Sequence, residues 1–109
     1  MSEKDDYKRQ RKYENASPLR KRLIRRAQQA NNNAHKHSVP GILTYRDLEK
    51  LFDEHKYCLL CGTSNQLTVD HVVAMSLGGH NKLDNLQVLC FKCNSRKSQI
   101  TMDCRATID

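Results

Sequence analysis

The sequence predicts a small α+β fold, and three observations lead to that prediction. The chain has 109 residues, of which 38% are hydrophobic and 6% aromatic, so it can form at most one domain with a modest core. Two Cys-x-x-Cys pairs, Cys58/Cys61 and Cys90/Cys93, stand in the second half. Short stretches with strand composition lie between the pairs, and helical patterns lie before and after them.

The two cysteine pairs have the spacing of a closed zinc site. Both thiolates of a Cys-x-x-Cys pair can reach one ion, and two pairs complete a tetrahedral site with no open position. We therefore expect one structural Zn²⁺ per chain. Such a site can contribute on the order of 10 kcal/mol to folding, which a domain with a modest core needs. The fifth cysteine, Cys104, has no partner at this spacing and is expected to be a free thiol.

The formal net charge of +7 is concentrated in the first half of the chain. Residues 1–57 hold 14 Lys and Arg against 8 Asp and Glu, whereas residues 58–109 hold 5 against 4. Residues 7–26 alone contain nine basic residues and one acid. This density attracts a polyanion such as nucleic acid, but a solvated helix surface or a tail would have the same composition. The charge run alone does not decide between these interpretations.

A basic helix is expected over about residues 18–31. Ser17 and Pro18 suit an N-cap and the first helical position, and apolar residues recur at helical spacing as far as Ala34. Three asparagines, residues 31–33, predict its end. Because its apolar stripe is thin, we expect this helix to dock lightly or to become ordered on DNA.

The sequence Val-Pro-Gly at residues 39–41 predicts a linker, which divides the chain into two parts. Residues 1–40 would form a basic, largely helical N-terminal extension with its linker, and residues 41–109 the compact domain. Thr44 and Asp47 predict a capping box at the start of the first helix of that domain. The expected elements are a helix over 45–55, strands over 67–73 and 86–89, and a helix from Asn94 to about Met102 with Ile100 facing inward.

Four polar residues that could act in catalysis or bind a metal lie between and beside the cysteine pairs: Asp70, His71, Asn85 and Asn94. With Gly78-Gly79 and Asn85-Leu-Gln between them, they give residues 44–98 a pattern that resembles the HNH endonuclease family, the ββα-metal nucleases. The resemblance implies a ββα-metal fold with a four-cysteine zinc site, preceded by the basic arm. Many members end the motif in His, whereas this chain has Asn94, which changes the ligand type and leaves the architecture intact.

The resemblance also implies a role for each matched residue. His71 would be the general base, since a neutral imidazole can take a proton from water. Asp70 and Asn94 would bind a catalytic Mg²⁺ or Mn²⁺ through oxygen atoms. Asn85 would brace the loop and hold His71 in its rotamer. Since a regular strand points Asp70 and His71 to opposite faces, a twist or bulge is expected there.

The implied activity is one-metal hydrolysis of DNA that leaves 5′-phosphate and 3′-hydroxyl ends. There are two alternatives. The chain could be a non-catalytic, zinc-stabilised nucleic-acid-binding module, or a nuclease subunit of a phage packaging complex. The chain resembles stand-alone phage or mobile-element members, so the cytoplasm of a bacterial or phage-infected cell is the expected setting. No apolar run suits a membrane or a signal sequence. Residues expected to contact DNA, each with a solvated surface as the alternative, are Arg20, Arg22, Arg25, Arg26, His80, Arg96 and Lys97.

A single HNH site cuts one strand, so double-strand cleavage would need a homodimer or two successive events. The sequence does not distinguish between these routes.

Overall fold

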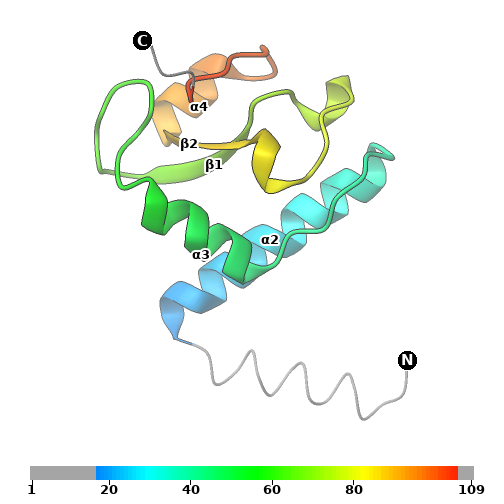
Figure 1. Cartoon of the computed structure of the whole chain (residues 1–109), viewed down its shortest axis with the longest axis horizontal. Coiled ribbons are helices and arrows are strands. Elements are labelled where there is room, and N and C mark those ends of the chain that lie inside the picture. The colour runs from blue at the N-terminus through cyan, green and yellow to red at the C-terminus, as the bar shows by residue number, and fades with distance from the viewer. Residues whose placement is uncertain (1–16, 106–109) are drawn as a thin grey trace.

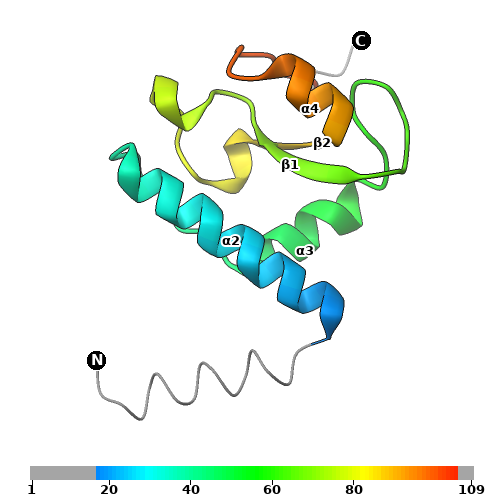
Figure 2. The ribbon, with the colours of Figure 1, turned by 180° about the vertical axis from the view of Figure 1, so that it is seen from behind.

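The computed structural model describes residues 17–105, and in that range the chain forms three layers (Figure 1). A two-stranded antiparallel hairpin lies between helix α4 on one side and the paired helices α2 and α3 on the other, as the view from behind also shows (Figure 2). The elements are α2 Pro18–Lys36, α3 Tyr45–Glu54, β1 Leu67–His71, β2 Leu86–Cys90 and α4 Phe91–Lys97, with short 3₁₀ helices at Met75–Leu77 and Leu83–Asn85. This arrangement confirms the predicted small α+β fold.

Helix α2 starts where the sequence predicts but ends five residues later, at Lys36. The side chain of Ser17 accepts a hydrogen bond from the backbone N–H of Arg20, 3.2 Å away. The predicted end at residues 31–33 is wrong, because Asn31 does not cap the helix. Its side chain instead bonds both backbone groups of Leu43, at 2.8 and 2.9 Å. The four basic residues at positions 8–12 lie outside the described range.

The expectation that α2 docks lightly is also wrong. Leu23, Ala27 and Ala34 are buried, and α2 packs along α3. Alanine has so small a side chain that the helices can approach closely with little apolar volume, which explains why the stripe looks thin in the sequence. The division of the chain at residue 41 stays a prediction.

Helix α3 confirms its predicted capping box. The Thr44 hydroxyl accepts from the backbone N–H of Asp47 at 3.3 Å, and the Asp47 carboxylate accepts from the backbone N–H of Thr44 at 2.9 Å. Its inner face enters the main hydrophobic cluster, which joins α2, α3, β2 and the segment between the helices. That cluster consists of Leu23, Ala27, Leu43, Leu48, Leu51, Leu86 and Val88.

The hairpin is regular along its whole length. Its register runs from Leu67 opposite Cys90 to His71 opposite Leu86. Strand β1 ends two residues earlier than predicted because the next backbone amides leave the sheet. Val72 donates to the backbone carbonyl of Asn85 at 2.8 Å, and Val73 donates to the side-chain oxygen of Asn85 at 3.0 Å.

Helix α4 is shorter than predicted and begins earlier. It starts at Phe91, directly after Cys90, and ends at Lys97 because Ser98 takes a positive φ of 53°. The chain then turns away from the core, so Ile100 is 60% exposed, and the inward position expected for it is wrong. Within the described residues, no helix combines the length and apolar character needed to cross a membrane.

Candidate functional site

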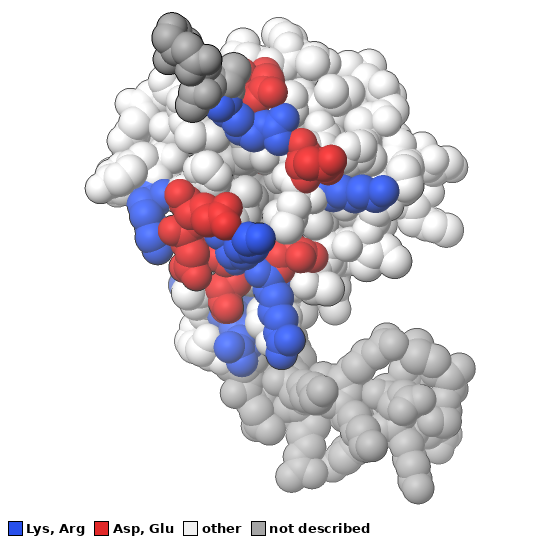
Figure 3. Space-filling model, in the orientation of Figure 1, with Lys and Arg blue, Asp and Glu red and all other residues white. Residues whose placement is uncertain are grey.

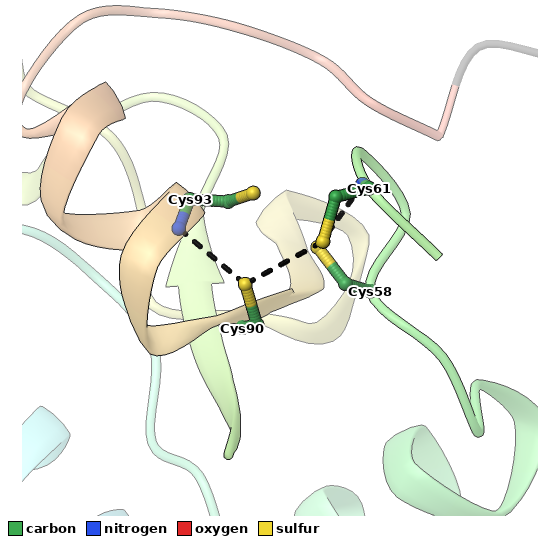
Figure 4. Close-up of side chains that lie close together, drawn as sticks. All are labelled: Cys58, Cys61, Cys90 and Cys93. Carbon is green, nitrogen blue, oxygen red and sulfur yellow. Dashed lines mark hydrogen bonds between the residues drawn. The ribbon is translucent and has the colours of Figure 1, made fainter. Parts of the chain in front are cut away.

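The four cysteines of the two pairs converge at one end of the hairpin. Figure 4 shows Cys90 and Cys93, from the junction of β2 and α4, facing Cys58 and Cys61 from the loop before β1. All four sulfurs lie within 4.8 Å of one another, and those of Cys61 and Cys90 are 3.7 Å apart. A tetrahedral zinc ion with sulfur ligands at about 2.3 Å places neighbouring sulfurs about 3.8 Å apart. The donor set and its spacing therefore fit a zinc-type metal site.

Local hydrogen bonds preform the two halves of this cysteine cluster. The backbone N–H of Cys61 donates to the sulfur of Cys58, and that of Cys93 donates to the sulfur of Cys90, both at 3.5 Å. These bonds fold each Cys-x-x-Cys segment so that its two sulfurs share one side. The cluster packs with Leu89, and Leu59, Leu67 and Cys104 cover it in part.

The thiols of the cluster differ in acidity. Burial opposes ionisation of Cys58, but hydrogen bonds from the backbone N–H groups of Cys61, Cys90 and Leu60 outweigh it and lower the pKa to about 6. Burial and hydrogen bonds with the neighbouring sulfurs raise the pKa of Cys93 to about 12. One thiolate thus forms readily while a second resists ionisation. A divalent cation between the sulfurs would compensate the added negative charge.

A second polar site lies at the other end of β1. Asp70, His71 and Asn94 line one pocket of about 470 Å³, although they come from a strand and a helix. The regular register shows no bulge between Asp70 and His71. The two side chains reach the same pocket because it lies where the strand ends. The rest of the lining comes from the end of α2, from β1 itself, from the loop after β1 and from the residues after α4: Asn33, Lys36, His37, Val69, Ala74, Met75, Ser76, Ser98 and Gln99.

The carboxylate of Asp70 is buried and is bound by two side chains that the sequence analysis did not predict as partners. Lys97 Nζ lies 3.1 Å from Asp70 Oδ2, and Gln87 Nε2 donates to the same oxygen at 2.8 Å. Both Lys97 and Gln87 are buried. The surface position expected for Lys97 is therefore wrong, because its ammonium group neutralises Asp70 inside the protein instead of reaching outward to DNA.

The amide of Asn94 is oriented by a short chain of hydrogen bonds. Thr68 Oγ1 donates to the backbone carbonyl of Leu89 at 2.8 Å, so it accepts from Asn94 Nδ2, also at 2.8 Å. With its nitrogen turned toward Thr68, Asn94 directs Oδ1 the other way. An oxygen in that position suits a hard cation such as Mg²⁺.

His71 contacts a residue that the sequence analysis missed. Its Nε2 lies 2.9 Å from Oδ1 of Asn81, a residue with no exposed surface. Asn85 was expected to brace the loop and to hold His71; its side chain makes hydrogen bonds with the backbone of Val73 and His80 in that loop, and not with His71. Its Oδ1 accepts from the Val73 N–H at 3.0 Å, and its Nδ2 donates to the carbonyls of Val73 and His80 at 3.0 and 2.8 Å. No sequence pattern distinguishes Asn81 from the other loop asparagines.

The four arginines of α2 that are expected to contact DNA are all exposed, but two of them pack on aromatic rings. Arg20 lies over the ring of Tyr45 at 5.0 Å, and Arg26 over that of Phe52 at 5.5 Å. Burial, with a smaller contribution from Arg22, lowers the pKa of Arg26. These contacts attach α2 to α3.

The remaining predicted DNA contacts differ in exposure. Arg96 is exposed on α4. His80 is half-buried, with Nε2 3.5 Å from Asp84 Oδ1 and a buried Nδ1 that has no hydrogen-bond partner among the described residues. The face seen in Figure 3 carries acidic and basic side chains side by side over α3. A mixed surface of this kind does not attract DNA strongly.

A comparison with protein families matches residues 56–99 to the HNH endonuclease family. Searches of curated proteins and of solved structures gave no match. The matched segment contains both cysteine pairs, the hairpin and α4, and therefore the zinc-type site together with the pocket residues of β1 and α4. Over residues 56–99 the chain is thus similar to the HNH endonucleases.

Proposed function

We propose that this protein is a metal-dependent endonuclease that hydrolyses DNA phosphodiester bonds at the pocket of Asp70, His71 and Asn94. The HNH domain indicates nuclease activity in general, with DNA as the substrate. The single observation that carries the finer proposal is that these three side chains line one pocket. A zinc-stabilised binding module would have no need for a carboxylate, an imidazole and an amide oxygen around one cavity.

The oxygen atoms of the pocket fit a hard divalent cation. Asp70 offers Oδ1, whose nearest partner is Lys97 Nζ at 3.4 Å, and Asn94 offers Oδ1. Two protein ligands of this type suit Mg²⁺ or Mn²⁺, which retain several water molecules. When bound, the ion would polarise the phosphate and stabilise the leaving 3′ oxygen.

His71 would take the proton from the attacking water. Its place at the end of β1 fixes its backbone, and its contact with Asn81 fixes the ring. Attack of water on phosphorus, with departure of the 3′ oxygen, leaves a 5′-phosphate and a 3′-hydroxyl end. Lys97 would keep Asp70 charged and in place, since a buried carboxylate needs a compensating charge.

DNA would approach along the side of α2 that leads to this pocket. Lys36 and His37, in and just after the last turn of α2, line the pocket itself, and Arg22 and Arg25 are exposed on earlier turns of the same helix. Phosphate contacts from such residues are independent of sequence and position the duplex.

A supercoiled-plasmid assay with Mg²⁺ or Mn²⁺ tests the proposal. We expect wild-type protein to nick the plasmid and His71→Ala to lose at least about a hundredfold in rate, the usual contribution of a general base. His55→Ala, at the end of α3 and outside the pocket, is the matched control and should cut like wild type. A wild-type protein that leaves DNA intact with every divalent ion, yet binds it, would support the binding-module alternative.

The other alternative, a nuclease subunit of a phage packaging complex, is tested by isolating the proteins that bind this chain and measuring cleavage with and without them. In that case the isolated chain would cut weakly and its activity would rise in the presence of the packaging proteins. Cleavage at full rate by the purified chain alone, with product ends that a DNA ligase can reseal, would favour the stand-alone endonuclease.

A further inference from the structure

A continuous series of hydrogen bonds connects helix α2 to the ring of His71. It begins at the backbone of Leu43, passes through the side chains of Asn31 and Asn81, and ends at His71 Nε2. The residues come from four separate parts of the chain: α2, the segment before α3, the loop after β1, and β1 itself. Each link has a donor and an acceptor that can be assigned in turn.

The amide of Asn31 is oriented by main-chain groups, whose roles are unambiguous. The backbone N–H of Leu43 donates to Asn31 Oδ1 at 2.8 Å, and Asn31 Nδ2 donates to the backbone carbonyl of Leu43 at 2.9 Å. A flipped amide would place two donors together and two acceptors together. Asn31 therefore presents its oxygen, and not its nitrogen, to Asn81.

The amide of Asn81 is oriented by two acceptors. Its Nδ2 donates to Asn31 Oδ1 at 2.9 Å and to the backbone carbonyl of Gly41 at 3.3 Å. Both partners are oxygens, so the nitrogen of Asn81 must face them. Its Oδ1 is then the atom that lies 2.9 Å from His71 Nε2, and an amide oxygen can only accept.

We propose that Asn81, held by Asn31 of α2, fixes the tautomer of His71 with the proton on Nε2 and the lone pair on Nδ1. In a neutral imidazole only one nitrogen carries a proton, and the hydrogen bond of one nitrogen decides the role of the other. Nδ1 is therefore the atom that accepts the proton of the attacking water. This catalytic consequence rests on the proposed function, whereas the tautomer rests on the hydrogen bonds alone.

The backbone around Asn81 leaves this arrangement little freedom. The N–H of Asn81 donates to the carbonyl of Pro40 at 2.7 Å. Gly41 has a φ of 117°, and a Cβ there would clash with the backbone carbonyl of Asn81. The segment after α2 thus lies directly against Asn81, and a side chain at position 41 would push the two apart. The helix expected to be an accessory arm supplies a positioning residue for the general base.

Nuclear magnetic resonance of the full-length, zinc-loaded protein with ¹⁵N-labelled histidine tests the proposal. Spectra recorded above the titration range of imidazole show which ring nitrogen of His71 carries the proton. We expect the Nε2–H form, with an Hε2 proton that exchanges slowly with water. Free imidazole itself has some preference between its tautomers, so the exchange rate of Hε2 is the decisive quantity.

Three variants of α2 separate the hydrogen-bond role from a general loss of structure. Asn31→Leu should speed Hε2 exchange by about tenfold or more, because Asn81 loses the partner that orients it. Asn31→Asp keeps an oxygen for Asn81 but loses the donor to the Leu43 carbonyl, so its Hε2 should exchange more slowly than in Asn31→Leu and faster than in wild type. Asn32→Leu, at the exposed neighbouring position, should behave like wild type.

The proposal is overturned if wild-type His71 carries its proton on Nδ1, or if Hε2 exchanges equally fast in Asn31→Leu and wild type. Should Asn31→Leu fail to fold, the exchange rate of Hε2 in wild type decides: an Hε2 that exchanges as fast as that of a solvent-exposed histidine overturns the proposal. These spectra need neither DNA nor a catalytic ion, so their outcome is independent of nuclease activity. Conversely, a wild-type protein that fails to cut DNA refutes the proposed function and leaves the tautomer result unchanged.

Discussion

Lys97 Nζ lies 3.1 Å from Asp70 Oδ2, and the side chains of the two residues are 1% and 6% exposed. Lys97 Nζ also donates to the backbone carbonyl of His71 at 3.1 Å. One buried ammonium group therefore contacts both residues of the Asp-His dipeptide on β1. It links the end of α4 to the strand that carries the candidate base and a candidate metal ligand.

Replacing Lys97 by methionine should destabilise the protein by about 3–5 kcal/mol, because it leaves the buried carboxylate of Asp70 without a compensating charge. Urea denaturation of zinc-loaded protein measures the loss. Lys50→Met, at an exposed position of α3, is the matched control and should change stability by no more than about 0.5 kcal/mol. A Lys97→Met protein as stable as this control would contradict the structural role of the ion pair.

The same Lys97→Met variant should bind Mn²⁺ more tightly than wild type. Lys97 and the proposed catalytic ion are both cations that Asp70 would attract, so removing one removes a competitor. Titration followed by the electron paramagnetic resonance signal of free Mn²⁺ measures the affinity without any cleavage step. Equal or weaker binding by the variant would show that Lys97 and the ion do not compete for Asp70.

Zinc binding should weaken as the pH falls, and more steeply below about pH 6. Cys93, with a pKa raised to about 12, must lose a proton to bind zinc at any ordinary pH. Cys58, with a pKa lowered to about 6, is mostly ionised above that pH, so its own proton joins those of the other cysteines in competing with zinc only below it. Competition with a chromophoric chelator over a range of pH values measures the slope.

Cysteine variants provide the control for this zinc prediction. Cys61→Ser should lower the zinc content far below one ion per chain and unfold the domain around the hairpin. Cys104→Ser should retain the ion, since Cys104 only packs against the cluster and is not one of its four converging sulfurs. A Cys61→Ser protein that retains zinc and structure would contradict the assignment of the site.

Exchanging Arg22 and Arg25 for glutamine should weaken DNA binding and flatten its salt dependence. Each lost phosphate contact should reduce the slope of log affinity against log salt concentration by about 0.9. Deleting the N-terminal segment as far as residue 26 is a poor test, because Leu23 belongs to the hydrophobic core. Lys50→Gln on α3 is the control, and an unchanged slope in the double variant would assign these arginines to the solvated surface.

Leu48→Ala should cost about 2–5 kcal/mol of unfolding free energy, the usual range for a leucine removed from a packed core. Leu48 is 1% exposed and joins α3 to the cluster that also contains residues of α2 and β2. Leu77→Ala, at a position 59% exposed, should have little effect. Equal stability of the two variants in thermal or urea denaturation would show that α3 is not part of the cooperative core.

The elements that depend on local chemistry could be predicted from the sequence. The cysteine pairs, the capping box at Thr44 and the start of α2 at Pro18 each follow from residues close together in the chain. The ends of α2 and α4 could not be predicted in this way. The asparagines that look like a helix stop include Asn31, whose partner Leu43 lies twelve residues away.

The partners of the site residues were also beyond sequence analysis, for a physical reason. Lysine is usually exposed, so a buried Lys97 can be recognised only once Asp70 is known to face it. Gln87 is a partial exception, because the hairpin register places it directly opposite Asp70. Pairing the two predicted strands in register would have suggested that contact. Asn81 lies in an irregular loop, so no helical or strand periodicity in the sequence indicates that it contacts His71.

Cys90 ends β2, caps α4 with its sulfur and lies in the four-cysteine cluster. No residue separates the strand from the helix, so no loop at this junction could absorb a change in chain length. An insertion or deletion of one residue here would rotate Cys93 and Asn94 by about 100° around the helix axis relative to the strand. Libraries of single-residue insertions should therefore find this junction intolerant, while the exposed residues 64–65 of the loop before β1 accept added length.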